Sequence, residues 1–176
     1  MKIFLYRLKK LFSISKSLTF YHLLKCLVEH PPVVIYQMGK VGSYSIFDSL
    51  ELYGIKSVFH THVMNPVRLK NITEKRVKRY LEEKGPPPPD FTLAKTLYRF
   101  FVKNGKKAKF ISLVREPIGR NVSAFFQNFH LYTGVESGKG EFSIDEIVEL
   151  FLNKYDHTIP FTWFDEEIEK TLKIDV

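Results

Sequence analysis

A chain of 176 residues can bury the core of one domain, and its 16 Phe and 9 Tyr argue against intrinsic disorder. Its formal net charge of +8 favours an anionic partner: a nucleotide, an acidic glycan, nucleic acid or a membrane surface. We interpret the basic residues as scattered, and they match no helix-turn-helix, zinc-finger or RNP-like pattern, so the sequence argues against specific binding of nucleic acid.

Residues 1–30 combine basic and apolar side chains. They contain no run of about 18 uncharged apolar residues, so we expect no transmembrane helix. The segment is either a basic amphipathic arm that contacts anionic lipid or a segment that packs on the domain. The single cysteine, Cys26, excludes an internal disulfide and suits a reducing compartment. We therefore expect a cytoplasmic protein, with or without peripheral membrane contact through residues 1–30, and one domain over residues 31–176.

The first predicted element is a buried strand, Val33–Tyr36, followed by a glycine loop over residues 39–43 and a helix that ends at Gly54. A helix N-terminus and the charge of Lys40 together attract anions. The alternative is an ordinary turn with a solvated lysine. The apolar face of the helix is expected to contain Ile46, Leu50 and Tyr53.

The loop differs from a Walker A motif at two positions. Val34 replaces the first glycine, and Val41 replaces the hydroxyl residue that binds magnesium. We therefore expect no metal at this loop.

A second strand is predicted over residues 57–62. Because strand side chains alternate between faces, His60 and His62 should share one face. They are either a functional pair or two partly buried polar side chains.

The next segments are predicted to be helices joined by an extended connection. A helix with a solvated basic side is expected over residues 65–83, and the proline-rich residues 85–90 form a rigid surface connection. A further helix over residues 91–104 should end at Gly105.

The third strand is predicted over residues 109–114, with Arg115 at its carboxyl end. Arg115 could instead form a salt bridge with Glu116. Pro117 suits the first turn of the following helix. The apolar face of that helix is expected to contain Ile118, Val122, Phe125, Phe126 and Phe129.

Residues 133–141, with three glycines, are expected to be a mobile loop. Ser143 and Glu146 are spaced as a capping box that opens a helix through Asn153. A last helix is predicted to start near Thr162, with Trp163 as a core anchor.

The alternation of strands and helices predicts an α/β fold with a parallel sheet covered on both faces. Ligands of such folds bind at the carboxyl ends of the strands. Lys40, His62 and Arg115 each follow a predicted strand end.

Two segments resemble the nucleotide-binding motifs of sulfotransferases that use 3′-phosphoadenosine 5′-phosphosulfate (PAPS). Residues 37–45, QMGKVGSYS, resemble the loop that holds the 5′-phosphosulfate. Residues 114–126, VREPIGRNVSAFF, resemble the 3′-phosphate motif of the carbohydrate sulfotransferases and the capsular polysaccharide synthesis proteins. Residues 60–62, His-Thr-His, are similar to a two-histidine segment of the uronyl 2-O-sulfotransferases, and residues 162–167 are similar to the capsular group.

The resemblance implies a three-layer, P-loop-like sulfotransferase fold. It also implies transfer of a sulfuryl group from PAPS to a carbohydrate hydroxyl, without a metal, which leaves adenosine 3′,5′-bisphosphate. His62 would be the base, His60 would orient its neighbours, and Arg115 and Ser123 would hold the 3′-phosphate. Lys40 would also stabilise charge on the leaving oxygen. The 5′-phosphate would be held by Lys40, Val41, Gly42, Ser43, Tyr44 and Ser45.

Two other functions stay open. The chain stops at Val176, where relatives continue, so a truncated relative that only binds a nucleotide or a polyanion also fits. A nucleotide kinase fits less well, because Val41 replaces the magnesium-binding hydroxyl. Arg120 is interpreted either as a second phosphate contact or as a solvated helix residue.

Overall fold

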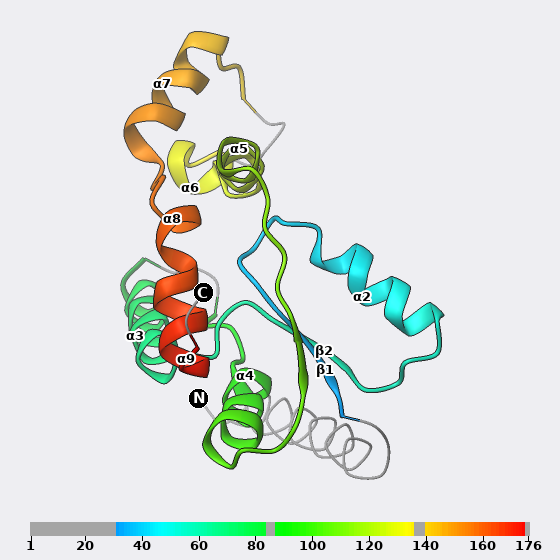
Figure 1. The fold of residues 1–176 in the computed structure, drawn as a ribbon. Helices are drawn as coiled ribbons and strands as arrows, with labels where there is room; N and C mark the ends of the chain where they lie inside the picture. Colours follow the sequence, from blue (N-terminus) through cyan, green and yellow to red (C-terminus); the bar gives the residue numbers. More distant parts are fainter. Residues whose placement is uncertain (1–30, 84–86, 136–139, 175–176) are drawn as a thin grey trace, which may run out of the picture. The chain divides into compact units, whose positions relative to one another are not determined.

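The computed structural model describes residues 31–83, 87–135 and 140–174 (Figure 1). The chain divides into two compact units. The first contains the described residues up to Tyr36 together with Tyr44–Ser112, and the second contains Gln37–Ser43 with the described residues from Leu113 onward. The predicted arm over residues 1–30 lies outside the described residues.

A three-stranded parallel sheet in the first unit confirms the predicted α/β class. The central strand β1 (Val33–Tyr36) pairs with β2 (Val58–Thr61) on one side and β3 (Lys109–Ile111) on the other. All four residues of β1 are buried. Their sequence, Val-Val-Ile-Tyr, consists of the β-branched and aromatic side chains that suit a strand covered on both faces.

The third strand is shorter than predicted, because β3 ends at Ile111 and not at Val114. Within the described residues it pairs with β1, and the ladder ends at the pair Ile35 and Ile111. By this register Leu113 and Val114 lie past Tyr36, the last residue of β1, and Val114 is exposed. Arg115 therefore lies four residues past the strand and belongs to the second unit.

The first unit contains four helical segments that flank the sheet: α2 (Ser43–Leu52), except for its first residue, α3 (Pro66–Glu83), α4 (Thr92–Leu97) and the π-helix η1 (Tyr98–Lys103). In Figure 1, α2 lies to one side of the strands and α3 to the other. These segments confirm the three helices predicted in this part of the chain, although half of the helix predicted over residues 91–104 is π-helical.

Local sequence signals explain most of these helix ends. Asn65 caps α3, because its Oδ1 accepts hydrogen bonds from the amides of Val67 and Arg68. Gly54 follows α2 with a φ of 91°, a conformation that glycine adopts without strain. Tyr53 lies after the end of α2 and is exposed, so its predicted place on the apolar face is wrong.

The proline-rich connection is only partly visible, because residues 84–86 lie outside the described residues. Residues 87–90 have no regular secondary structure, as their prolines predict. The helical segment after them ends at Lys103 with Asn104 as its C-cap, and Gly105 follows with a φ of 62°.

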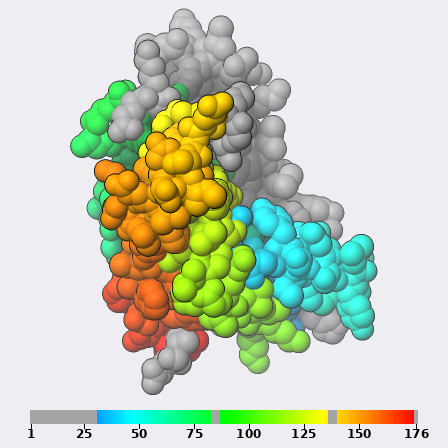
Figure 2. All heavy atoms as spheres, turned by 90° about the horizontal axis from the view of Figure 1, so that it is seen from above, coloured from blue at the N-terminus to red at the C-terminus, as the bar shows by residue number. Residues whose placement is uncertain are grey.

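The second unit is helical. Its helices are α5 (Pro117–Gln127), α6 (Phe129–Thr133), α7 (Ile144–Lys154), α8 (Ile159–Trp163), the π-helix η2 (Phe164–Glu169) and α9 (Lys170–Leu172). The capping box of α7 is confirmed, because Ser143 and Glu146 each accept from the backbone amide of the other. Figure 2 shows α7, in yellow to orange, at the molecular surface.

Aromatic side chains form the core of this unit. Phe125 is 1% exposed and packs edge-on against Phe129, Phe151 and Tyr155. Edge-to-face pairs of this kind add stability beyond the area that they bury. Two of the five predicted apolar positions of α5 are wrong, because Ile118 is 70% exposed and Phe126 is also exposed.

The last helical stretch starts at Ile159, earlier than the predicted Thr162. Pro160 lies in its first turn, where a missing amide hydrogen costs nothing. Trp163 is buried, which confirms the prediction of a core anchor. The predicted mobile loop over residues 133–141 includes residues 136–139, which lie outside the described residues.

Candidate functional site

The glycine loop of the second unit contains two residues with left-handed backbone conformations. Lys40 has a φ of 72° and Gly42 a φ of 89°. Glycine adopts this conformation freely, but a lysine is strained there by about 1 kcal/mol or more. A non-glycine residue that is kept in this conformation is typical of functional loops.

Two arginines of the 3′-phosphate-like motif hold the carbonyl oxygens of this loop. Arg115 Nη1 donates to the carbonyl oxygen of Lys40 at 3.1 Å, and Arg120 Nε donates to that of Gly39 at 3.1 Å. The structure thus brings together the two segments that carry the resemblance.

These two contacts also orient the amides of the loop. In a trans peptide the N–H points opposite to the carbonyl of the preceding residue. Because the carbonyls of Gly39 and Lys40 face the arginines, the N–H groups of Lys40 and Val41 face away from them. The loop therefore presents its donors on the side that the arginines leave open.

The donors that follow in the chain are also open. From Lys40 through Ser45, no backbone N–H donates to an acceptor among the described residues. Ser43 to Ser45 form the first turn of α2, whose N-terminal N–H groups carry a partial positive charge. A run of open donors beside a lysine is a suitable environment for a phosphate or sulfate.

Arg120 corrects both sequence interpretations, since it is neither solvated nor an open phosphate contact. It is 6% exposed, and its Nη1 donates to Asn121 Oδ1 at 3.0 Å and to the hydroxyl of Tyr155 at 2.9 Å. Burial raises the pKa of Tyr155 although the Arg120 charge opposes this shift, so the hydroxyl stays protonated. Arg120 therefore ties the Gly39 peptide to the aromatic core.

Arg115 is exposed and does not form the alternative salt bridge with Glu116 among the described residues. Glu116 instead caps α5, because its carboxylate accepts from the amides of Ile118 at 2.7 Å and Gly119 at 2.6 Å. These backbone hydrogen bonds, more than the charge of Arg115, hold the pKa of Glu116 below its usual range. One N–H group of Arg115 donates to the carbonyl oxygen of Lys40. The other N–H groups of its guanidinium have no acceptor in the described part of the chain.

Ser123 lies on α5, eight residues after Arg115, and is half-buried. The described residues offer its hydroxyl no hydrogen-bond partner, and it makes no hydrogen bond to the loop. Its predicted role beside Arg115 therefore stays a prediction.

The two histidines form a separate group in the first unit. The ring of His60 packs edge-on against that of His62, with centroids 4.6 Å apart, which confirms that both side chains share a face. The ring of Tyr44, on the first turn of α2, also packs edge-on against His60, with ring centroids 5.3 Å apart. His60 is half-buried and His62 is exposed, as expected for the deeper and the outer member of the pair.

His60 is electrically neutral at physiological pH. Burial, and secondarily the neighbouring His62, lower its pKa to about 4. Its Nε2 is buried and has no hydrogen-bond partner among the described residues. This nitrogen is therefore better placed to orient a neighbour than to accept a proton from a substrate.

Known proteins add no assignment: no family model, no curated protein and no solved structure matches this chain. Among the described residues, no group of three His, Cys, Asp or Glu side chains gathers as a metal site would require. No helix in the described ranges combines the length and apolar character needed to cross a membrane.

Proposed function

We propose that this chain is a PAPS-dependent sulfotransferase of the carbohydrate type, with a three-layer, P-loop-like fold. The observation that supports it most is the run of open amide donors from Lys40 to Ser45, tied through its carbonyls to Arg115 and Arg120. PAPS carries two anionic groups: the 5′-phosphosulfate needs such donors, and the 3′-phosphate needs a separate cation.

Lys40 and the amides of Val41 to Ser45 would hold the 5′-phosphate. When bound, PAPS would supply the sulfuryl group and the adenosine 3′,5′-bisphosphate leaving group. Lys40 would stabilise the negative charge that develops on the bridging oxygen as its bond to sulfur breaks. Val41 leaves no hydroxyl at the position that binds magnesium in a Walker A motif, and the positive charge in this proposal would come from side chains and amides.

Arg115 would hold the 3′-phosphate with the N–H groups that the Lys40 carbonyl leaves free. A guanidinium presents its donors in a planar fork that matches phosphate oxygens. Ser123 would add a hydroxyl donor from α5. The first amides of α5 would not take part, because Glu116 already occupies them.

His62 would accept the proton of the acceptor hydroxyl as the acceptor oxygen bonds to sulfur. Its exposure leaves it open to a large carbohydrate. His60, neutral and deeper, would hold the ring of its neighbour in place. The single cysteine and the basic residues 1–30 fit a cytoplasmic protein with peripheral membrane contact.

Thermal unfolding in the presence of nucleotides tests the proposal. Adenosine 3′,5′-bisphosphate at 100 times its Kd should stabilise the protein by about 2.7 kcal/mol. ATP with magnesium should stabilise it much less, and the opposite order would support a nucleotide kinase. Lys40→Ala should abolish the shift, whereas Lys56→Ala, which removes an exposed lysine outside the loop, should preserve it.

Transfer to a glycan acceptor separates an enzyme from a binding-only relative. Stabilisation by the bisphosphate with no detectable transfer from PAPS to any acidic or neutral glycan would support the binding-only alternative. No shift at millimolar bisphosphate would refute the proposal.

A further inference from the structure

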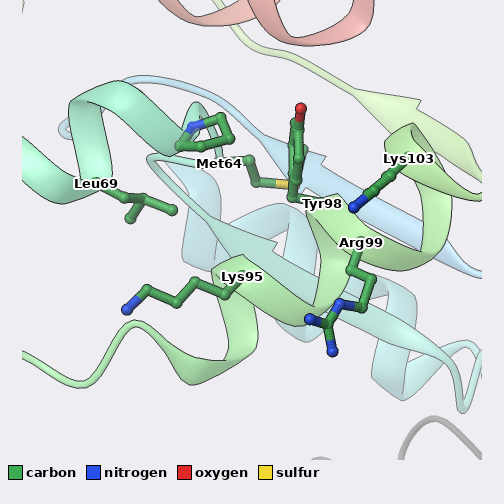
Figure 3. A pocket seen from close by; sticks show the side chains of 7 residues that line it. Met64, Leu69, Lys95, Tyr98, Arg99 and Lys103 are labelled. Carbon is green, nitrogen blue, oxygen red and sulfur yellow. The ribbon is translucent and has the colours of Figure 1, made fainter.

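A pocket of about 340 Å³ lies in the first unit, away from the glycine loop in sequence. This volume is at the lower end of the range of small-molecule sites. Figure 3 shows its side chains, which come from the segment after β2, from the start of α3 and from α4 and η1. The lining residues are Met64, Pro66, Leu69, Lys95, Tyr98, Arg99 and Lys103.

Three cations line this pocket, and no acidic residue does. Lys95, Arg99 and Lys103 follow one another at intervals of four residues. None of them forms an ion pair or a side-chain hydrogen bond within the described part of the chain. In Figure 3, Lys103 points toward Tyr98, Arg99 extends downward, and Lys95 extends to the left, away from the other two.

The π-helix helps to keep these cations on one side. In an α-helix, residues four apart overshoot one full turn, because a turn takes 3.6 residues. A π-helix bonds residue i to i+5, so its turns take more residues and a step of four falls short. Lys95 lies in α4, and Arg99 and Lys103 lie in η1. The step from Lys95 to Arg99 therefore overshoots a full turn, the step from Arg99 to Lys103 falls short of one, and the two angular deviations partly cancel.

The floor of the pocket is apolar. Met64 and Leu69 are almost fully buried, and the ring of Tyr98 stands beside Met64 in Figure 3. An apolar floor with a cationic rim suits a molecule that carries an anionic group on an apolar or planar body.

The basic charge of the chain is concentrated in the same region, contrary to our first interpretation. Residues 68–109 contain 13 Lys and Arg against 4 Asp and Glu, a net charge of +9, whereas the whole chain carries +8. A field of this kind raises the local concentration of anions around the pocket.

We propose that this pocket binds a small organic phosphate or sulfate ester, separately from the nucleotide assigned to the glycine loop. The anionic group lies among Lys95, Arg99 and Lys103, and the apolar part of the molecule contacts Met64 and Tyr98. The ligand is either a free metabolite or the head group of an anionic lipid, since both present the same chemistry.

Calorimetric titration of the full chain with phenyl phosphate tests this site. Phenyl phosphate should bind, and phenol should bind at least tenfold more weakly, because the cations need the anion. Lys95→Ala/Arg99→Ala should weaken binding at least tenfold. The matched control Lys75→Ala/Lys78→Ala removes the same charge from α3, outside the pocket, and should change binding less than twofold. An equal loss in both double variants would mean general attraction and would overturn the site.

Competition distinguishes this site from the loop. Saturating adenosine 3′,5′-bisphosphate should leave phenyl phosphate binding unchanged, as should Arg115→Ala. Loss of binding in either case would overturn a separate site. Vesicles with phosphatidate, compared with pure phosphatidylcholine, identify the source: displacement of phenyl phosphate only by phosphatidate indicates a lipid head group, and no displacement indicates a soluble ester.

Discussion

Replacing Arg120 by methionine should separate the folding of the second unit from the shape of the glycine loop. The side chain of Met has similar length and no charge, so the variant removes the guanidinium from a buried position without a large cavity. The hydrogen bonds to Gly39, Asn121 and Tyr155 are lost together.

The loss of stability should be moderate. The Tyr155 hydroxyl and Asn121 Oδ1 lie 3.5 Å apart and can form a hydrogen bond with each other. The group that loses its hydrogen-bond partner is then mainly the Gly39 carbonyl. A lost hydrogen bond to a charged donor costs about 1.5–3 kcal/mol. Part of this cost is offset, because a buried charge and its desolvation penalty disappear as well. We expect the free energy of unfolding to fall by about 1–2 kcal/mol.

The effect on the nucleotide should be larger than this loss suggests. Without Arg120, the peptide between Gly39 and Lys40 is free to rotate, and its N–H no longer faces the phosphate. We expect affinity for adenosine 3′,5′-bisphosphate to fall at least tenfold. Urea unfolding and calorimetric titration of the same preparation measure the two quantities.

Two companion variants complete this test. Arg115→Met, at an exposed position, should change stability by less than about 0.5 kcal/mol but weaken nucleotide binding by about 2–4 kcal/mol. Arg120→Lys keeps the positive charge but lacks the planar set of guanidinium donors. Compared with Arg120→Met, it should recover more of the free energy of unfolding than of the nucleotide affinity. Unchanged nucleotide affinity in folded Arg120→Met would refute the idea that this arginine positions the loop.

Three further predictions concern Lys40 and the histidines. Lys40→Gly should be about 1 kcal/mol more stable to urea than Lys40→Ala, because glycine removes the strain at a φ of 72°, while both lose nucleotide affinity. His62→Ala should lower sulfuryl transfer about 10²-fold or more with nucleotide affinity intact, and activity lost only in His60→Ala would exchange the two roles. Since the pKa of His60 is about 4 when folded and about 6.5 when unfolded, stability should fall as pH drops from 6.5 to 4. His60→Phe should flatten this decline in urea titrations, and an unchanged slope would count against a neutral, buried His60.

The parts of the fold that depend on neighbours in the chain were predictable. The buried run Val33–Tyr36, the capping box at Ser143 and the proline at the start of α5 each carry a local signal. The length of β3 does not, because the register with β1 leaves Leu113 and Val114 past Tyr36, the last residue of β1. A strand prediction from Lys109 to Val114 could not include that limit.

The sequence predicted which residues belong to the candidate nucleotide site better than it predicted the role of each residue. The loop and Arg115 are in contact, as the order of the motifs suggests, but the burial of Arg120 was missed. Its partners Gly39 and Tyr155 are 81 and 35 residues away, so no local pattern reveals them. One signal was present: Arg120 lies four residues before Ala124, on the buried stripe of α5. The concentration of positive charge in residues 68–109 could have been found from the sequence by counting charged residues segment by segment.

The hydrogen bonds that hold the glycine loop have a consequence for the folding of the chain during its synthesis on the ribosome. They join residues 75 and 81 positions apart, so the loop is synthesised well before either arginine exists. At typical rates of translation this interval lasts roughly 4–16 s. During this time the carbonyls of Gly39 and Lys40 lack the two arginine donors that hold them in the folded protein. A nascent chain stalled before Leu113 would therefore carry the sequence of the loop without its shape.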